Sequence, residues 1–77
     1  MKTFTISLAS INDVKEFVNL ATQQICDIDL ISGRYVIDAK SIMGIFSIDL
    51  TKPIAVQVRS EGEEADNFCK MVEKFIV

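Results

Sequence analysis

Two repeating patterns alternate along the chain, and their order limits the folds that its 77 residues can adopt. Four segments alternate apolar and polar residues, as strands with one buried face do: 2–8, 26–32, 34–38 and 54–59. A segment of roughly 11–24 instead repeats apolar residues at spacings of three and four, which predicts an amphipathic helix. A second pattern of this kind follows the last strand and closes the chain.

Both long helices have predictable starts and faces. Ser10 is a candidate N-cap for the first helix, and Asp13 favours the positive end of its dipole. The buried stripe of that helix is predicted to comprise Ile11, Val14, Val18, Ala21 and Ile25, widened by Phe17. The stripe of the closing helix is predicted to comprise Ala65, Phe68, Val72, Phe75 and Ile76.

The predicted element order is β-α-β-β-α-β-α. Ser32-Gly33 is a turn signal that joins the second and third strands into a hairpin. We expect a four-stranded antiparallel sheet with one apolar face, covered by the two long helices, in an α+β open-faced sandwich. Residues 1–77 are long enough for one domain only.

A short apolar run, Ala39–Ile48, does not fit the main core. Ser41 is a candidate N-cap for a helix there. Four large side chains crowd into about one and a half turns after it: Ile42, Met43, Ile45 and Phe46. One buried face cannot hide all of this surface, so part of it is expected to be exposed and to bind a protein partner.

Composition excludes several functions. The chain has no histidine, so phosphohistidine chemistry, imidazole bases and histidine metal ligands are ruled out. The net charge of −3, without a basic cluster, argues against nucleic acid as a direct partner. Cys26 and Cys69 lack metal-site spacing and are expected to be reduced, buried and small hydrophobes.

No cofactor, enzyme activity or membrane association is predicted. There is no nucleophile–base pair, phosphate loop or metal-ligand set. The acidic residues around Glu61–Asp66 are interpreted as a helix start with a solvated surface, and Asp27 and Asp29 as solvated strand positions. Without a signal-like start or a long apolar run, the expected compartment is the cytoplasm.

The run Ala39-Lys40-Ser41-Ile42-Met43-Gly44-Ile45, with Phe46-Ser47-Ile48, closely resembles the regulatory serine segment of HPr proteins. HPr is the small phosphocarrier of the bacterial sugar phosphotransferase system. Asp27-Ile28 and Ser60–Glu63 also look like family positions, and the element order is the family's. The resemblance covers essentially the whole chain.

The resemblance implies that the carrier site is degenerate. The family pattern Gly-Leu-His-Ala-Arg-Pro falls on residues 8–13, anchored by Phe17-Val18. Ser10 then takes the place of the histidine, Asn12 that of the arginine and Asp13 that of the proline. A phosphoserine ester is too inert to pass its phosphoryl group on, so we expect no carrier activity. A plain N-cap is the simpler interpretation of Ser10.

The resemblance also implies a regulatory role, as in the catabolite-repression HPr-like (Crh) proteins, which lack the histidine but keep the serine. Ser41 corresponds to the serine phosphorylated by HPr kinase/phosphorylase, although an unmodified N-cap remains an alternative. The implied partner-binding residues are Lys40, Ile42, Met43, Phe46 and Leu20, of which some are expected to be core residues.

Candidate partners are HPr kinase/phosphorylase, a transcription regulator and phosphotransferase system enzymes. Asn12 departs from an arginine that helps Crh proteins dock their transcription factor, which weakens that specific interpretation. The alternative function is an unmodified docking or decoy module for the phosphotransferase system enzymes.

Overall fold

The computed structural model describes every residue of the chain, 1–77. Seven elements follow one another: β1 (Lys2–Ile6), α1 (Ile11–Thr22), β2 (Ile28–Ser32), β3 (Tyr35–Asp38), α2 (Ile42–Phe46), β4 (Ile54–Val58) and α3 (Glu63–Met71). A short 3-10 helix, Glu73–Phe75, comes after α3. The predicted order β-α-β-β-α-β-α and the α+β class are confirmed.

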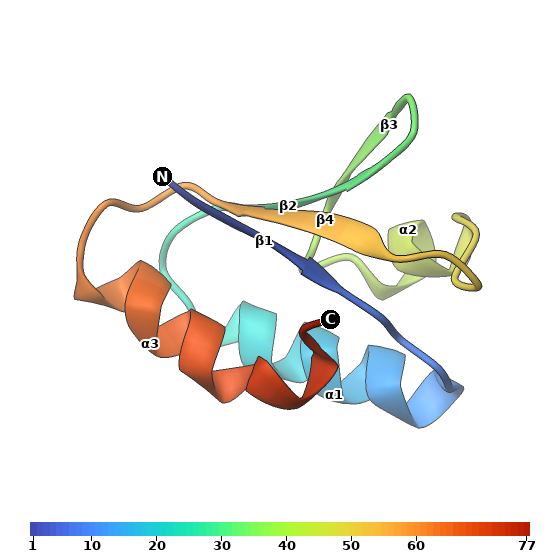
Figure 1. Cartoon of the computed structure of the whole chain (residues 1–77), viewed down its shortest axis with the longest axis horizontal. Coiled ribbons are helices and arrows are strands. Elements are labelled where there is room, and N and C mark those ends of the chain that lie inside the picture. Colours follow the sequence, from blue (N-terminus) through green and yellow to red (C-terminus); the bar gives the residue numbers. More distant parts are fainter.

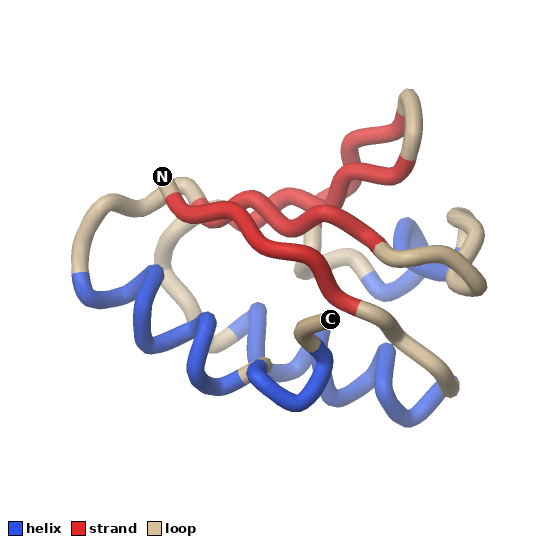
Figure 2. The backbone as a smooth tube through the Cα atoms, in the orientation of Figure 1, coloured by secondary structure: helices blue, strands red, loops and turns tan.

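The four strands form one antiparallel sheet with the order β1-β4-β2-β3. Phe4, Val56 and Leu30 lie opposite one another across it and share the face towards the helices. Helices α1 and α3 lie along this face, whereas no helix covers the other (Figure 1; the tube in Figure 2 follows the same layers). The result is the open-faced sandwich predicted from the alternating pattern.

The core lies between the sheet and the two long helices. Sixteen residues are buried and all of them are hydrophobic. The Phe17 ring meets Phe68 and Phe75 edge to face, with ring centroids 5.8 and 6.2 Å apart. Edge-to-face packing of this kind stabilises aromatic pairs beyond the area they bury. This aromatic cluster holds α1 to the C-terminal segment.

The predicted stripe of the first helix is wrong at both ends. Ile25 is 93% exposed because α1 ends at Thr22 and the chain leaves the helical path before residue 25. Ile11, the first helical residue, is 62% exposed. The stripe that the fold buries runs through Val14, Phe17 and Ala21 instead.

The predictions that Phe75 and Ile76 belong to the closing helix, and that both cysteines are buried, need correction. Helix α3 ends at Met71, so Phe75 is buried from the 3-10 helix, and Ile76 pairs with Ile6 as an isolated bridge. Cys26 and Cys69 are only partly buried, although both remain free thiols. The bend after α3 was not visible as a break in the apolar spacing.

Two strand predictions also change in detail. The second strand begins at Ile28 rather than at residue 26, and the first ends at Ile6. Asp29 is not simply solvated, because its side chain is 15% exposed and pairs with Arg59 at 2.7 Å. Asp27 is exposed, as expected.

No helix of the structure combines the length and the apolar character that crossing a membrane requires.

Candidate functional site

The short helix α2 is capped by serine at both ends. Ser41 has an extended backbone, and its Oγ accepts the backbone N–H of Gly44 at 3.2 Å. At the other end, the Ser47 hydroxyl donates to the Gly44 carbonyl at 2.6 Å. A helix of five residues has little stability of its own, so these bonds and its packing hold it in place. The N-cap predicted for Ser41 is confirmed.

Gly44 brings α2 into close contact with β3. A Cβ added at this position would lie 2.7 Å from Ile37 Cγ2 and 3.2 Å from Ser41 Oγ. No larger residue fits at that distance without displacing its neighbours. The close approach fixes which side of α2 faces the sheet, and therefore which side faces outwards.

The two sides of α2 differ as the crowding of apolar residues predicted. Ile45 is fully buried, and Ile42 and Ile48 pack partly against the core. Met43 is 77% exposed and Phe46 is 40% exposed. We call Met43 and Phe46, with the partly buried Ile42 and Leu20 beside them, the α2 surface. Met43 is the most exposed of these four residues.

The two other predicted partner-binding residues are partly engaged within the fold. Leu20 is half-buried and packs against the core from α1, which contacts α2. Lys40 is also half-buried, and its Nζ donates to the Gln24 carbonyl at 2.8 Å. A cation near the C-terminal end of a helix is favourable. Lys40 therefore connects the end of α1 to the start of α2.

Glu64 forms a second link to the end of α1, and no local pattern in the sequence indicates it. Its Oε2 accepts the backbone N–H of Ile25 at 2.9 Å. This hydrogen bond, together with the Cys26 thiol, lowers the pKa of the Glu64 carboxyl. Burial, with the Glu64 carboxylate beside it, raises the pKa of Cys26, so this thiol is a poor nucleophile.

The start of α1 carries the three residues assigned above to the degenerate carrier site. Ser10 Oγ accepts the Asp13 backbone N–H at 3.1 Å, which confirms it as an N-cap. Asp13 Oδ2 accepts the Ala9 backbone N–H at 3.0 Å. Asn12 is exposed. The Ser10 hydroxyl and the Asp13 carboxylate thus both stabilise the helix start.

A shallow depression of about 460 Å³ lies beside this helix start. Residues 7–11 form one wall, and Leu50 and Thr51 form the other. The loop wall is held by Asp49, whose carboxylate accepts the Thr51 hydroxyl and backbone N–H. These two hydrogen bonds lower the pKa of Asp49. No basic residue lines the depression, so it offers little for a phosphoryl group.

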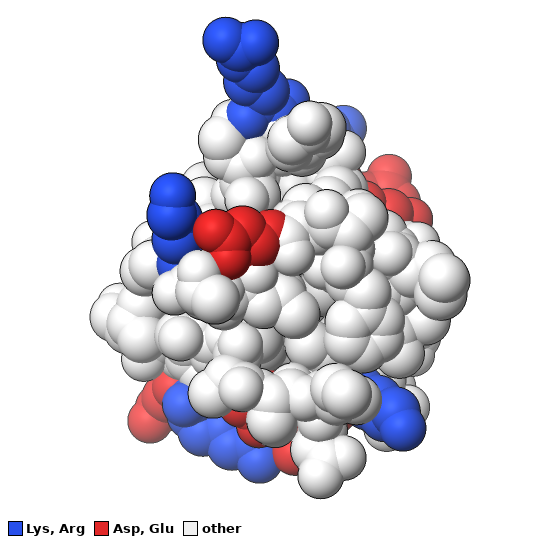
Figure 3. All heavy atoms as spheres, turned by 90° about the vertical axis from the view of Figure 1, so that its right-hand side faces the viewer, with Lys and Arg blue, Asp and Glu red and all other residues white.

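The α2 helix, the start of α1 and the loop before β4 lie at the same end of the molecule (Figure 1). Figure 3 looks onto this end, and uncharged side chains occupy most of the face. A face of this kind suits a protein partner better than a phosphate or a metal ion. No group of three or more acidic or cysteine side chains lies in a metal-binding arrangement anywhere in the structure.

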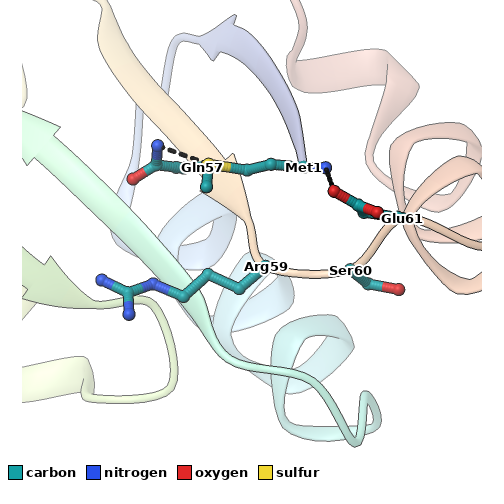
Figure 4. A pocket seen from close by; sticks show the side chains of 5 residues that line it. All are labelled: Met1, Gln57, Arg59, Ser60 and Glu61. Carbon is teal, nitrogen blue, oxygen red and sulfur yellow. Dashed lines mark hydrogen bonds and ion pairs between the residues drawn. The ribbon is translucent and has the colours of Figure 1, made fainter.

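Another depression, of about 500 Å³, lies at the far end of the sheet, lined by Met1, Gln57, Arg59, Ser60 and Glu61 (Figure 4). Its charges are paired: the Met1 amino group lies 3.6 Å from Glu61, and Arg59 binds Asp29. Gln57 Nε2 lies 2.7 Å from the Met1 sulfur. This depression has no free charged group to bind a ligand, so the α2 surface is the stronger candidate.

Comparison with known proteins points to one family. The family model PTS-HPr, described as the PTS HPr component phosphorylation site, matches residues 12–77. The matched range contains all of α2 and Ser41 but begins after Ser10. A search of curated protein sequences found no match.

Solved structures share the fold over almost the whole chain. HPr-C-His from Thermoanaerobacter tengcongensis has a TM-score of 0.74 and 22% identity, covering 96% of this chain and 93% of that one. The phosphocarrier protein HPr from Bacillus anthracis also has a TM-score of 0.74 and 22% identity, covering 99% and 96%. A Mycoplasma histidine-containing phosphocarrier protein gives 0.74 and 18%, covering 95% and 89%.

Proposed function

The chain belongs to the HPr family of the phosphotransferase system, and we propose that it is a cytoplasmic docking module of that system without carrier activity. HPr proteins are phosphocarriers and not enzymes. The exposed Met43 and Phe46 on α2 carry this proposal, because they present an apolar contact surface at a mostly uncharged end of the molecule.

Loss of carrier activity follows from the chemistry at the start of α1. Carrying a phosphoryl group needs a nucleophile whose adduct is high in energy, and the chain has no histidine. Ser10 already caps the helix, and the Asp13 carboxylate beside it would repel a phosphate. Incubation with phosphoenolpyruvate and the system's first enzyme should leave the intact mass unchanged. An acid-labile phosphate on the protein would contradict this part of the proposal.

Ser41 is proposed as a switch of the α2 surface. Its hydroxyl lies at the start of α2, two residues before Met43, and Ser41 is only partly buried. A phosphate there would place about two negative charges beside the apolar surface and would change which partner docks. The likeness of residues 39–48 to the family's regulatory segment supports the assignment.

Intact mass after incubation with ATP and HPr kinase/phosphorylase tests the switch. We expect one phosphate on the wild type and none on Ser41→Ala. Ser47→Ala is the matched control, because Ser47 caps the other end of α2, and it should still be phosphorylated. Wild-type protein that stays unmodified would remove the switch from the proposal.

An unmodified docking or decoy module is the second candidate. It is favoured by the hydrogen bond from Gly44 to Ser41 Oγ, which gives the serine a structural role without any modification. In this case the α2 surface would bind phosphotransferase system enzymes directly. Binding of equal strength by the wild type and Ser41→Ala, with no effect of the kinase, would distinguish it from the switch.

A further inference from the structure

The two edge strands of the sheet, β1 and β3, differ in how far their outer backbone groups are hydrogen-bonded. The outer edge of β1 is covered at its C-terminal end by the end of the chain: Ser7 N–H donates to the Phe75 carbonyl at 2.8 Å, and Val77 N–H donates to the Thr5 carbonyl at 3.0 Å. The other edge is β3, which pairs only with β2. An uncovered edge strand is a template for a further strand.

The backbone groups that β3 offers can be assigned from the ladder. Ala39 N–H donates to the Ile28 carbonyl at 2.8 Å, so residues 28 and 39 form a hydrogen-bonded pair. Such pairs alternate along an antiparallel ladder. Ile37 and Tyr35 therefore bond to β2 through their backbones, whereas the backbone N–H and C=O of Val36 point away from the sheet.

Although β3 is short and ends at Asp38, other features that protect edge strands are missing from it. Tyr35–Asp38 contains no proline and no lysine, and its register with β2 has no bulge. Tyr35 is 69% and Val36 is 62% exposed. Gly33, with a φ of 59°, forms the tight turn, and the hairpin projects away from the helices (Figures 1 and 2). Another strand can approach without meeting either long helix.

We propose that β3 pairs with β3 of a second copy of this chain, antiparallel and about a two-fold axis at Val36. Each Val36 then faces its equivalent, and Tyr35 faces Ile37 of the second copy. Arg34 reaches Asp38 of the second copy, and this pair occurs twice, once at each end. Self-complementarity of this kind is what a two-fold interface requires.

The charges of Arg34 and Asp38 favour the register centred on Val36, and they favour a second copy of this chain as the partner strand. Neither Arg34 nor Asp38 forms an ion pair within the chain. Asp38 is exposed, and although its Oδ1 accepts the Lys40 backbone N–H at 2.9 Å, its other oxygen has no partner within the chain. Shifting the register by two residues places Arg34 opposite Val36, or Val36 opposite Asp38, and the opposite charges no longer meet. Only the register centred on Val36 satisfies the outward backbone groups and both charges together.

Amide hydrogen exchange, measured by NMR from micromolar to millimolar concentration, tests the pairing. In the monomer the outward Val36 amide exchanges quickly, and we expect its exchange to slow as concentration rises. The Ile37 amide, bonded to β2, stays protected throughout and serves as the internal control. Sedimentation should show a matching change from monomer to dimer mass. A monomer with unchanged Val36 exchange at every concentration overturns the proposal, and leaves the edge to a different strand.

Charge reversal tests the register. Arg34→Glu creates two like-charge pairs and should raise the dimer dissociation constant about tenfold or more. Arg34→Glu combined with Asp38→Lys restores opposite charges and should recover most of the affinity. Lys15→Glu changes the net charge equally on the exposed side of α1 and should leave dimerisation unchanged. Equal effects of Arg34→Glu and Lys15→Glu overturn the register. The protected Ile37 amide verifies that each variant is folded.

Discussion

Gly44 is the residue at which α2 and β3 come closest. In an open helix, Gly→Ala stabilises a protein by up to about 1 kcal/mol. Here the new methyl group would lie 2.7 Å from Ile37 Cγ2, so we expect Gly44→Ala to destabilise the protein by about 1 kcal/mol. Chemical denaturation measures the change. The control is the Ile37→Ala background, which removes the nearest atom, so the same substitution should there cost much less stability. A gain in stability in the wild-type background would contradict the close contact.

The lowered pKa of Glu64 predicts that the stability of the fold depends on pH. Its pKa is lowered in the folded protein, mainly by the Ile25 backbone N–H, so its contribution is present above the usual value of 4.5. The contribution is lost as the pH falls through the lowered value. Asp49, whose pKa is lowered by Thr51, adds to the same loss.

Urea denaturation at about pH 7 and about pH 3 measures this dependence. Glu64→Gln should lose less stability on acidification than the wild type. Glu63→Gln, in the same turn of α3 but exposed and without a hydrogen bond, is the control and should follow the wild type. If Glu64→Gln and the wild type lose the same stability on acidification, the hydrogen bond from the Ile25 N–H to Glu64 does not contribute to stability.

Residue-scale features were predictable from the sequence only where the interaction is local. Ser10 and Ser41 cap helices that begin at the next residue, so their role could be identified from neighbouring positions. Two hydrogen bonds, from Lys40 Nζ to the Gln24 carbonyl and from the Ile25 N–H to Glu64, join residues far apart in the chain. Nothing near Lys40 or Glu64 in the sequence indicates those partners.

The role of Ser10 as the N-cap of α1 can be tested by its effect on stability. If Ser10 serves as the N-cap, Ser10→Ala should destabilise the protein by about 1 kcal/mol. Ser10→Asp supplies another capping oxygen and should remain close to the wild type. Thermal unfolding of the three proteins measures the difference. Equal losses for alanine and aspartate would mean that the Ser10 hydroxyl is not acting as a cap.

At the level of elements, periodicity predicted the order of all strands and helices but not their ends. The apolar spacing of α1 continues to Ile25, although the helix stops at Thr22. For α2, spacing could not tell which apolar residues face outwards. That orientation depends on the contact between Gly44 and Ile37, which appears only when β3 is in place.

The aromatic cluster holds the whole molecule together. Phe17 is fully buried between Phe68 and Phe75, so Phe17→Ala should cost about 3–5 kcal/mol, a large part of the stability of a small domain. Ile25→Ala, at a side chain that is 93% exposed, is the control and should change stability by no more than about 0.5 kcal/mol. Similar losses for both variants, in chemical denaturation, would contradict the packing of the core.

The whole molecule presents one covered sheet face, one bare face and a mostly uncharged end that contains α2. This arrangement places the α2 surface away from the covered sheet edge and on the opposite side of the fold from the depression at Met1. The family match and the exposed Met43 and Phe46 together support α2 as the proposed docking surface.

The most direct test is an amide chemical-shift titration of the isotope-labelled protein with the first enzyme of the phosphotransferase system and, separately, with HPr kinase/phosphorylase. We expect at least one partner to perturb residues 41–48, and Met43→Glu to weaken that binding about tenfold or more. Met71→Glu, the same change on α3, should bind like the wild type. Perturbations confined to other surfaces, or no response to either protein, would contradict docking through α2.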